Sequence, residues 1–295
     1  MKRKKLVGSL MLVLAALIWG TAFTAQRVGM DYAGPLSFNG VRCLIGAAVL
    51  VPVYLIFRRS RPTDGKKTLL AGLLCGLALF MATNLQQFGL VYTDAGKAGF
   101  ITTFYIILVP ILGIFLKKKT GAVTWLAVLI ALCGLYFLCM KSGEVRIAPG
   151  DLLVLGCAFF FAVQILVIDR FVQEVDGVLL CCIQFAVDGF LSLIAALILE
   201  KPDFGMLFKG WVPLLYTGVL SCGVAYTLQI VGQKSLHPTV ASLLMSLESS
   251  FAVLGGWLIL HERLTGREFL GCGCMLAAVV LVQLAPAPKE KTGGP

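Results

Sequence analysis

The chain has 295 residues, of which 59% are apolar and 14% are charged, and its mean hydropathy is +0.92. Soluble domains are about 45–50% apolar and about 25% charged, so this much apolar surface cannot be buried in one soluble core. The composition therefore indicates a membrane protein with several spans. At about 20 residues per transmembrane helix, ten helices leave no room for a separate soluble domain or a nucleotide-binding cassette.

Ten apolar runs of membrane-spanning length follow one another along the chain. They are residues 6–26, 35–57, 68–92, 96–116, 121–140, 151–169, 178–199, 210–231, 238–260 and 266–285. The first run follows the basic segment Lys2–Lys5, as in a signal peptide, but it is about 20 residues long and no clear cleavage site follows it. We therefore expect an uncleaved first helix. Residues 286–295 are polar and contain Pro and Gly, and we expect them to form a disordered cytoplasmic tail.

The net charge of +10 comes from 25 Lys and Arg against 15 Asp and Glu. With a cytoplasmic N-terminus, 16 basic residues fall in cytoplasmic segments and 8 in outer segments, while Arg42 lies inside the second run. This asymmetry follows the positive-inside rule and predicts a multi-pass protein of the cell membrane with both termini in the cytoplasm. Basic residues placed in this way are explained by the lipid bilayer, and no nucleic-acid partner is expected.

The cysteines and histidines indicate no metal or disulfide chemistry. All ten cysteines fall inside apolar runs, where they are expected to act as small buried side chains. Cys272 and Cys274 are two residues apart and point to different sides of a helix, which makes a poor metal pair. The only two histidines lie near the ends of runs. We therefore expect no metal site and no cofactor.

The chain resembles itself at an offset near 143 residues. Leu85–Gly89 in the third run aligns with Leu228–Gly232 in the eighth, and Ala82 aligns with Ala225. Because five spans form each half, the second half starts on the opposite side of the membrane. This predicts an all-α membrane protein of ten helices in two inverted repeats, residues 1–140 and 151–285, with a solute site at their interface near the midplane. Chance similarity between apolar segments is the alternative.

Several segments carry a resemblance to a known family. They are Ile18–Phe23 with its Trp-Gly pair, Arg42 at the start of the second run, residues 232–244, and the stretch from Leu247-Glu248 to residue 264. Together they resemble the EamA family of the drug/metabolite transporter superfamily. The family pattern Leu-Glu-Pro followed by Leu-Gly-Glu is altered here, with Ser249 in place of Pro and His261 in place of Gly. In the first half, residues 117–119 are three Lys in place of the Gly-Glu element.

The resemblance covers nearly the whole chain. It implies ten helices, two inverted halves and the transport of small molecules such as amino acids, other metabolites or drug-like compounds. It does not fix the substrate, the direction of transport or the energy source. A homodimer is an open alternative to a monomer.

Three ionisable residues lie well inside the spans, where charged side chains are costly and usually face a cavity or a partner. Arg42 and Glu248 both fall in the middle-to-outer half of their spans, so they could meet. Together they predict either a substrate or proton site or a structural ion pair between the two halves. Asp188 lies at mid-depth in the seventh span and either lines a cavity or bonds a neighbouring backbone group. Glu248 and Asp188 are the candidates for coupling.

Polar faces recur on the third and eighth spans. Asn84 and Gln87 are three residues apart, as are Tyr226 and Gln229, so each pair shares one face of a helix. Matching polar faces on the two halves predict a shared cavity that binds a polar solute. Hydrogen bonding between helices is the alternative function of these amides.

Trp19 and Tyr105 are expected to contact the apolar part of the solute, with packing as the alternative. Pro110 lies inside the fourth run, removes one helical hydrogen bond and is a candidate hinge, unless it only bends the helix.

These observations predict a secondary transporter that exports small organic solutes. A phosphate-binding loop of the Gly-rich Lys-Ser/Thr type is absent from the sequence, which speaks against ATP hydrolysis by this chain. The alternative is an intramembrane enzyme acting on lipid or peptide, which needs a nucleophile and base or a metal. By the predicted topology His237 and His261 lie on opposite sides, and Glu262 next to His261 does not face it. We therefore expect no enzymatic activity.

The predicted topology is tested by cysteine labelling. In a variant without accessible native thiols, Lys291→Cys should react with a membrane-impermeant maleimide only after the cells are permeabilised. Labelling of the introduced thiol in intact cells would contradict the cytoplasmic C-terminus and, with it, the odd number of spans in each half.

Overall fold

A computed structural model describes residues 2–57, 64–93, 95–118, 120–139, 149–259 and 265–284. Within these ranges every regular element is a helix, which confirms the all-α prediction. Eight of the described segments are long and apolar enough to cross a membrane, and Ala122–Phe137 is a shorter apolar helix. The predicted tail, His261 and Lys119 lie outside the described residues.

Seven of the predicted runs form single continuous helices, because a long apolar stretch in a membrane satisfies its backbone hydrogen bonds only within a helix. They are α1 Lys2–Gly29, α2 Pro35–Phe57, α3 Gly65–Tyr92, α6 Ala122–Cys139, α7 Pro149–Phe171, α8 Gly177–Leu199 and α14 Gly266–Leu284. Pro35 begins α2, where its missing N–H costs nothing. Asp64 and Asp176 begin α3 and α8 by accepting hydrogen bonds from backbone N–H groups of the first turn.

The other three runs are divided into shorter segments. The fourth run forms α4 Ala95–Thr102 and α5 Tyr105–Phe115, and the ninth forms α12 Pro238–Met245 and α13 Glu248–Ile259. The eighth forms α10 Trp211–Leu215, the π-helix η1 Tyr216–Ala225 and α11 Tyr226–Gln233, preceded by the short α9 Phe204–Lys209. The interruptions at residues 103–104 and 246–247 are 143 residues apart, the offset of the predicted repeat.

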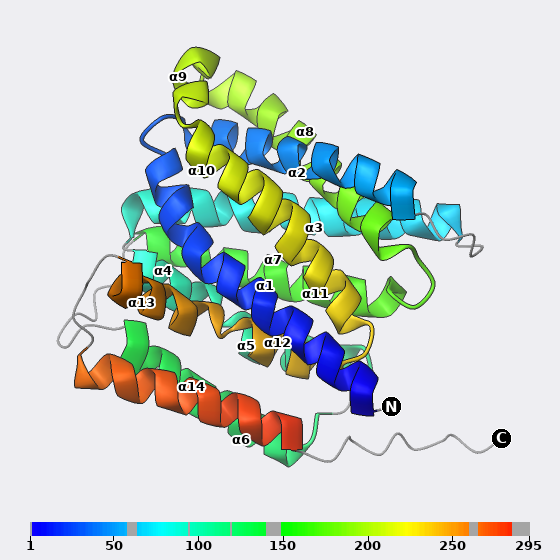
Figure 1. Cartoon of the computed structure of the whole chain (residues 1–295), viewed down its shortest axis with the longest axis vertical. Coiled ribbons are helices and arrows are strands. Elements are labelled where there is room, and N and C mark those ends of the chain that lie inside the picture. The colour runs from blue at the N-terminus through cyan, green and yellow to red at the C-terminus, as the bar shows by residue number, and fades with distance from the viewer. Residues whose placement is uncertain are drawn as a thin grey trace.

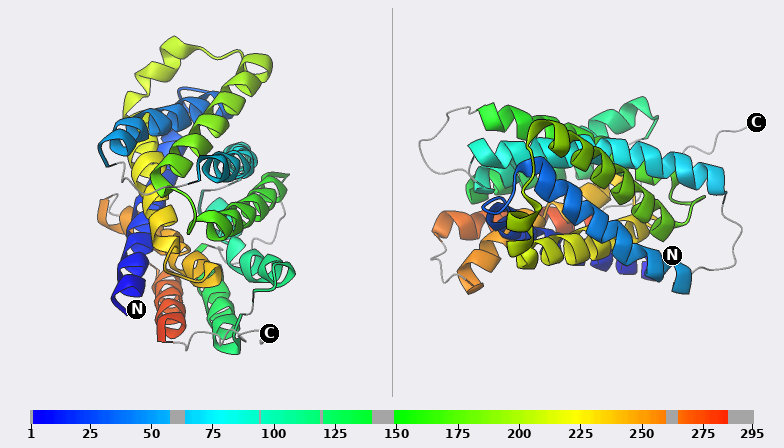
Figure 2. Two further views of the ribbon diagram at one scale, coloured as in Figure 1. Left: turned by 90° about the vertical axis from the view of Figure 1, so that its right-hand side faces the viewer. Right: turned by 90° about the horizontal axis from the view of Figure 1, so that it is seen from above.

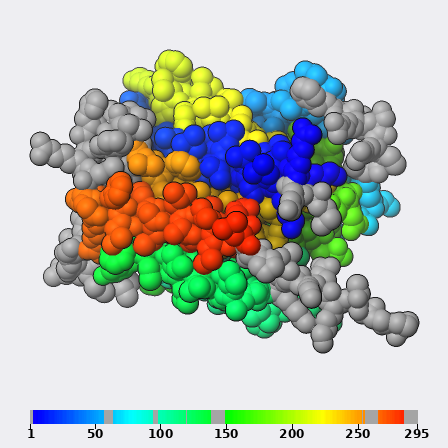
Figure 3. Space-filling view, turned by 60° about the horizontal axis from the view of Figure 1, so that its bottom comes forward, coloured from blue at the N-terminus to red at the C-terminus, as the bar shows by residue number. Residues whose placement is uncertain are grey.

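The helices form an elongated bundle (Figures 1 and 2). The pair α2 and α8 packs at one end of its long axis and the pair α6 and α14 at the other, with α1, α3, α7 and the divided helices between them. Figure 3 shows α14 beside α6 on the surface, with α1 next to them. Gln283 donates to Ser9 over 2.9 Å, so the end of α14 lies beside the start of α1.

Glu200 joins the end of α8 to the beginning of α2. It follows the last residue of α8, and its carboxylate accepts hydrogen bonds from the backbone N–H groups of Leu36, over 2.7 Å, and Ser37, over 2.8 Å. The Ser37 hydroxyl donates to the same carboxylate over 2.6 Å. A side chain at the end of α8 therefore satisfies the first N–H groups of α2, which have no partner within their own helix.

We predict that Glu200→Ala lowers the free energy of unfolding by about 1–2 kcal/mol, because it removes an N-terminal cap together with its favourable charge. The measurement is thermal unfolding of the purified protein in detergent. Asp203→Ala is the matched control, since Asp203 caps only the short α9, through the N–H of Met206. Equal melting temperatures for the wild type and Glu200→Ala would refute the capping role.

Candidate functional site

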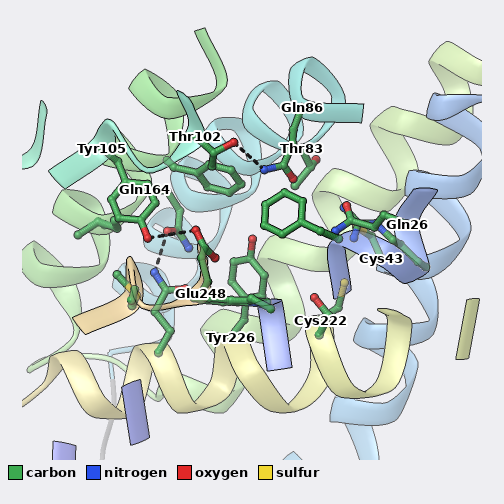
Figure 4. A pocket seen from close by; sticks show the side chains of 18 residues that line it. Gln26, Cys43, Thr83, Gln86, Thr102, Tyr105, Gln164, Cys222, Tyr226 and Glu248 are labelled. Atoms are coloured by element: carbon green, nitrogen blue, oxygen red, sulfur yellow. Dashed lines mark hydrogen bonds between the residues drawn. The ribbon is translucent and has the colours of Figure 1, made fainter. Parts of the chain in front are cut away.

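One cavity lies among helices from both halves of the chain (Figure 4). Its walls come from α1, α2, α3, the α4–α5 break, α7, the η1–α11 segment and the α12–α13 break. The space within these walls, including its open side, is about 620 Å³. On α1 the lining positions are Trp19, Phe23 and Gln26, all in the second half of that helix.

Six of the predicted site residues line this cavity. Trp19, Arg42, Tyr105, Tyr226, Gln229 and Glu248 all contribute to its wall. They are separated by up to 229 positions in the sequence, and the packing of the two halves brings them together.

Asn84 and Gln87 are placed elsewhere. Asn84 donates to the carbonyl of Phe80 over 2.7 Å and to the Ser192 hydroxyl over 2.8 Å, so its amide is used between α3 and α8. Gln87 is fully buried, and neither polar atom of its amide has a hydrogen-bond partner among the described residues. The cavity is lined instead by Thr83 and Gln86, one position earlier in each case. One position is about 100° around a helix, which is enough to turn a side chain out of a cavity.

Gln86 is therefore a lining residue that the choice of Asn84 and Gln87 missed. Its amide donates to the Thr102 hydroxyl over 3.2 Å. The signal was present in the sequence, because Gln86 aligns with Gln229 at the repeat offset.

The lining is matched between the halves. Four positions of the first half have a counterpart 143 residues later that also lines the cavity. The pairs are Thr83 with Tyr226, Gln86 with Gln229, Thr102 with Met245, and Tyr105 with Glu248.

The last of these pairs is in direct contact. Tyr105 is the first residue of α5 and Glu248 the first residue of α13, so each follows a helix break. The Tyr105 hydroxyl donates to Glu248 Oε1 over 3.3 Å. Gly20 allows α1 to pass close by, since a Cβ atom there would lie 2.6 Å from the Glu248 carbonyl oxygen. The glycine of the Trp-Gly pair thus fits α1 against the beginning of α13.

Arg42 is held from behind by a buried polar cluster. Its Nε donates to Asn39 Oδ1 over 2.9 Å, and Asn39 Nδ2 donates to Asp188 Oδ1 over 3.1 Å. Asp188 also accepts hydrogen bonds from Ser192 over 2.9 Å and from Thr83 over 3.0 Å. Asp188 therefore bonds side chains of α2, α3 and α8 and does not itself line the cavity. Of the two alternatives for Asp188, cavity lining and a bond to a neighbouring backbone group, neither matches these contacts, which come from side chains.

Arg42 and Glu248 do not form an ion pair. In the part of the chain that the structure describes, no carboxylate lies within 4.0 Å of the Arg42 guanidinium, and Asn39 is its hydrogen-bond partner. The Glu248 carboxylate instead accepts a hydrogen bond from the Tyr105 hydroxyl. A guanidinium and a carboxyl group thus line one cavity without forming an ion pair.

Aromatic and amide side chains form the rest of the wall. The Tyr226 ring packs edge-to-face against Trp19, with centroids 4.8 Å apart, and against Phe185, at 5.0 Å. Gln229 donates to Gln164 over 3.1 Å, so these two amides form a hydrogen bond between α11 and α7. Both of the uses that the sequence left open, cavity lining and bonding between helices, therefore apply to Gln229.

Pro110 lies inside α5 and is buried, while the interruption of this span lies at residues 103–104. His237 begins α12, with its Nδ1 accepting from the N–H of Thr239 over 3.4 Å. Among the described residues no group of three or more His, Cys, Asp or Glu could hold a metal ion.

Ion pairs join the halves at the end of the bundle where α1 begins. Lys67 at the start of α3 pairs with Glu174, which lies between α7 and α8 and also pairs with Arg170 at 3.6 Å. The Lys67 ammonium holds the pKa of the Glu174 carboxyl below its usual range. Lys118 after α5 pairs with Asp169 on α7.

Sequence comparison identifies the family. The pattern of the EamA-like transporter family matches residues 6–140 and 148–284, which is one copy in each half. The chain belongs to the EamA-like transporter family. An uncharacterized transporter of Archaeoglobus fulgidus is 32% identical over 95% of this chain and 87% of its own length.

Other proteins are similar to this chain over nearly all of its length. The uncharacterized transporter YoaV of Bacillus subtilis is 24% identical over 88% of this chain and 91% of its own. The uncharacterized inner membrane transporter YedA of Escherichia coli is 25% identical over 91% of this chain and 88% of its own length. A solved structure titled only as the crystal structure of a protein has a TM-score of 0.79 at 18% identity, covering 94% of this chain and 96% of that one. That likeness concerns the fold.

We predict that Asp188→Asn destabilises the protein by about 1–3 kcal/mol, because it places an amide N–H₂ where several donors converge on a carboxylate. The melting temperature in detergent is the measurement. Asp31→Asn, a neutralisation of an exposed residue, is the control and should leave it unchanged. A melting temperature of Asp188→Asn equal to that of the control would show that the cluster does not need the carboxylate.

Proposed function

We propose that this protein is a secondary transporter that exports small organic solutes by alternating access. The observation that supports it best is the cavity between the halves, lined by matching positions of both and containing Arg42 and Glu248 without an ion pair. A polar, charged cavity inside an apolar bundle is costly unless it binds a solute. The relatives that carry the name transporter support the same class of function.

The packing supports two inverted repeats. In the first half α3 packs against α7 and α8, and its counterpart in the second half, η1 with α11, packs against α1 and α2. The pairs α2 with α8 and α6 with α14 join each helix to its own counterpart. This is the pattern expected of a pseudo-two-fold axis between the halves, which lies in the membrane plane when each half has an odd number of spans.

The position of the cavity supports an arrangement open away from the cytoplasm. The lining residues of α1 lie in its second half, far from its basic start, while the ion pairs of Lys67 with Glu174 and Lys118 with Asp169 hold the other end together. In the proposed cycle these pairs separate when the cavity opens to the cytoplasm. The breaks at residues 103–104 and 246–247, together with Pro110, are the proposed hinges.

Of the two coupling candidates, Glu248 is the better placed. Its carboxylate lines the cavity, so protons and solute can both reach it. Asp188 is sealed behind Arg42 and Asn39, and we assign it the role of orienting Arg42 through Asn39.

We predict that Gln86→Leu and Gln229→Leu each reduce transport at least about fivefold, because each removes a polar group worth about 1 kcal/mol or more from the cavity wall. Gln87→Leu is the matched control, since its amide does not line the cavity, so its transport should stay near that of the wild type. The measurement is counterflow in proteoliposomes with a panel of amino acids and organic cations, normalised to folded protein. Loss of transport in Gln87→Leu alone would contradict the assignment of the wall.

A further inference from the structure

The two charges of the cavity are at separate places in its wall. Arg42 comes from α2 and is held by Asn39, whereas Glu248 comes from the start of α13 and is held by Tyr105. Both residues are buried, with exposed fractions of 4% and 6%. Each charge is therefore shielded from bulk water but faces the cavity.

Tyr226 lies between these two places. Its side chain lines the cavity together with Arg42 and Glu248. The Glu248 carboxylate accepts a hydrogen bond from Tyr105, and among the described residues it forms no ion pair with Arg42. Figure 4 shows Tyr226 between the side chains of Glu248 and Cys43, and Cys43 lies on α2, the helix that also carries Arg42.

The Tyr226 ring cannot swing away easily. Its edge-to-face contacts with Trp19 and Phe185 hold it from two sides. The middle of the cavity is therefore aromatic, and its charges lie on either side of that middle.

We propose that the cavity selects a zwitterion with a spacer, a solute whose carboxylate binds Arg42 and whose ammonium binds Glu248, with an apolar chain along Tyr226 and Trp19. This inference rests on the proposed transport function and specifies its substrate class. The guanidinium provides the planar fork that matches a carboxylate, and the Glu248 carboxylate accepts from an ammonium. Both ends of such a solute are bound only when its carboxylate reaches Arg42 and its ammonium reaches Glu248.

The order of the residues excludes a short solute. The ammonium and carboxylate of an α-amino acid share one carbon atom, so they cannot reach groups that lie on either side of a tyrosine ring. A chain of several methylene groups between the charges satisfies both. A solute with one charge makes only one of the two charge-assisted contacts and therefore binds more weakly.

The first test measures binding to the purified protein in detergent, by the rise of its melting temperature with ligand concentration. The probes are glycine, β-alanine, γ-aminobutyrate and ε-aminocaproate, with caproate and hexylamine as singly charged analogues of the longest. We expect one of the two longer zwitterions to bind about tenfold more tightly than glycine and than both singly charged analogues. Equal affinity for hexylamine, caproate and ε-aminocaproate, or no binding of any zwitterion at millimolar concentration, overturns the proposal.

The second test assigns each charge to its residue. Glu248→Gln should lower the affinity for ε-aminocaproate about tenfold and leave that for caproate nearly unchanged. Arg42→Gln should also lower the affinity for ε-aminocaproate about tenfold and leave the affinity for hexylamine nearly unchanged. Glu268→Gln, at the exposed start of α14, is the control and should change neither. If Arg42→Gln does not fold, Arg42→Lys keeps the positive charge but lacks the planar guanidinium. This variant should weaken the binding of ε-aminocaproate more than the binding of hexylamine. Parallel losses for all three ligands contradict the assignment.

Counterflow of the same probes separates this inference from the transport function. Transport of glycine or hexylamine without any preference for the longer zwitterions is consistent with the transport function and refutes selection of a spaced zwitterion. Binding with the expected preference but no counterflow of any probe supports the site and refutes transport.

Discussion

A carboxylate buried between membrane helices is tolerable only when hydrogen-bond donors surround it, and Asp188 meets this condition. Donors from α2 and α3 converge on it, together with Ser192 of its own helix. Because these partners must all be present at once, the cluster fixes how α2, α3 and α8 pack. Arg42 is attached to the cluster through Asn39, so the orientation of this cation depends on a carboxylate that does not line the cavity. Glu200 adds a second constraint on the same helices by capping α2 from the end of α8.

Most of the helices could be predicted from the sequence, because runs of about 20 apolar residues have few alternatives in a membrane protein. The breaks could not. The residues at the interruptions are Thr103-Phe104 and Ser246-Leu247, none of which is a helix breaker, whereas Pro110 stands inside a helix. The π-helix η1 likewise has no signature in its sequence. These features arise from packing between the halves, which local propensity does not contain.

Site residues could be predicted where a charged side chain lies inside a span. They could not be predicted where only the rotation of a helix about its axis decides which side chain faces the cavity. Arg42 and Glu248 stand out because a charge inside a span requires an explanation, and both line the cavity. Gln86 and Gln87 are adjacent amides, and only the rotation of α3 about its axis decides which one faces the cavity. Comparison of the two halves carries that missing information, since Gln229 matches Gln86 and not its neighbour.

The contact of Tyr105 with Glu248 joins two positions that are equivalent in the two halves. In an assembly of two identical halves, such a contact would bring a residue against its own copy. Two glutamates there would repel each other, and two tyrosines would leave the cavity without its anion. A fused chain can place the tyrosine donor opposite the carboxylate acceptor where equivalent positions of its halves meet, which two identical copies of either half cannot do. This single position therefore gives a chemical reason for the two halves to have diverged once they were encoded together.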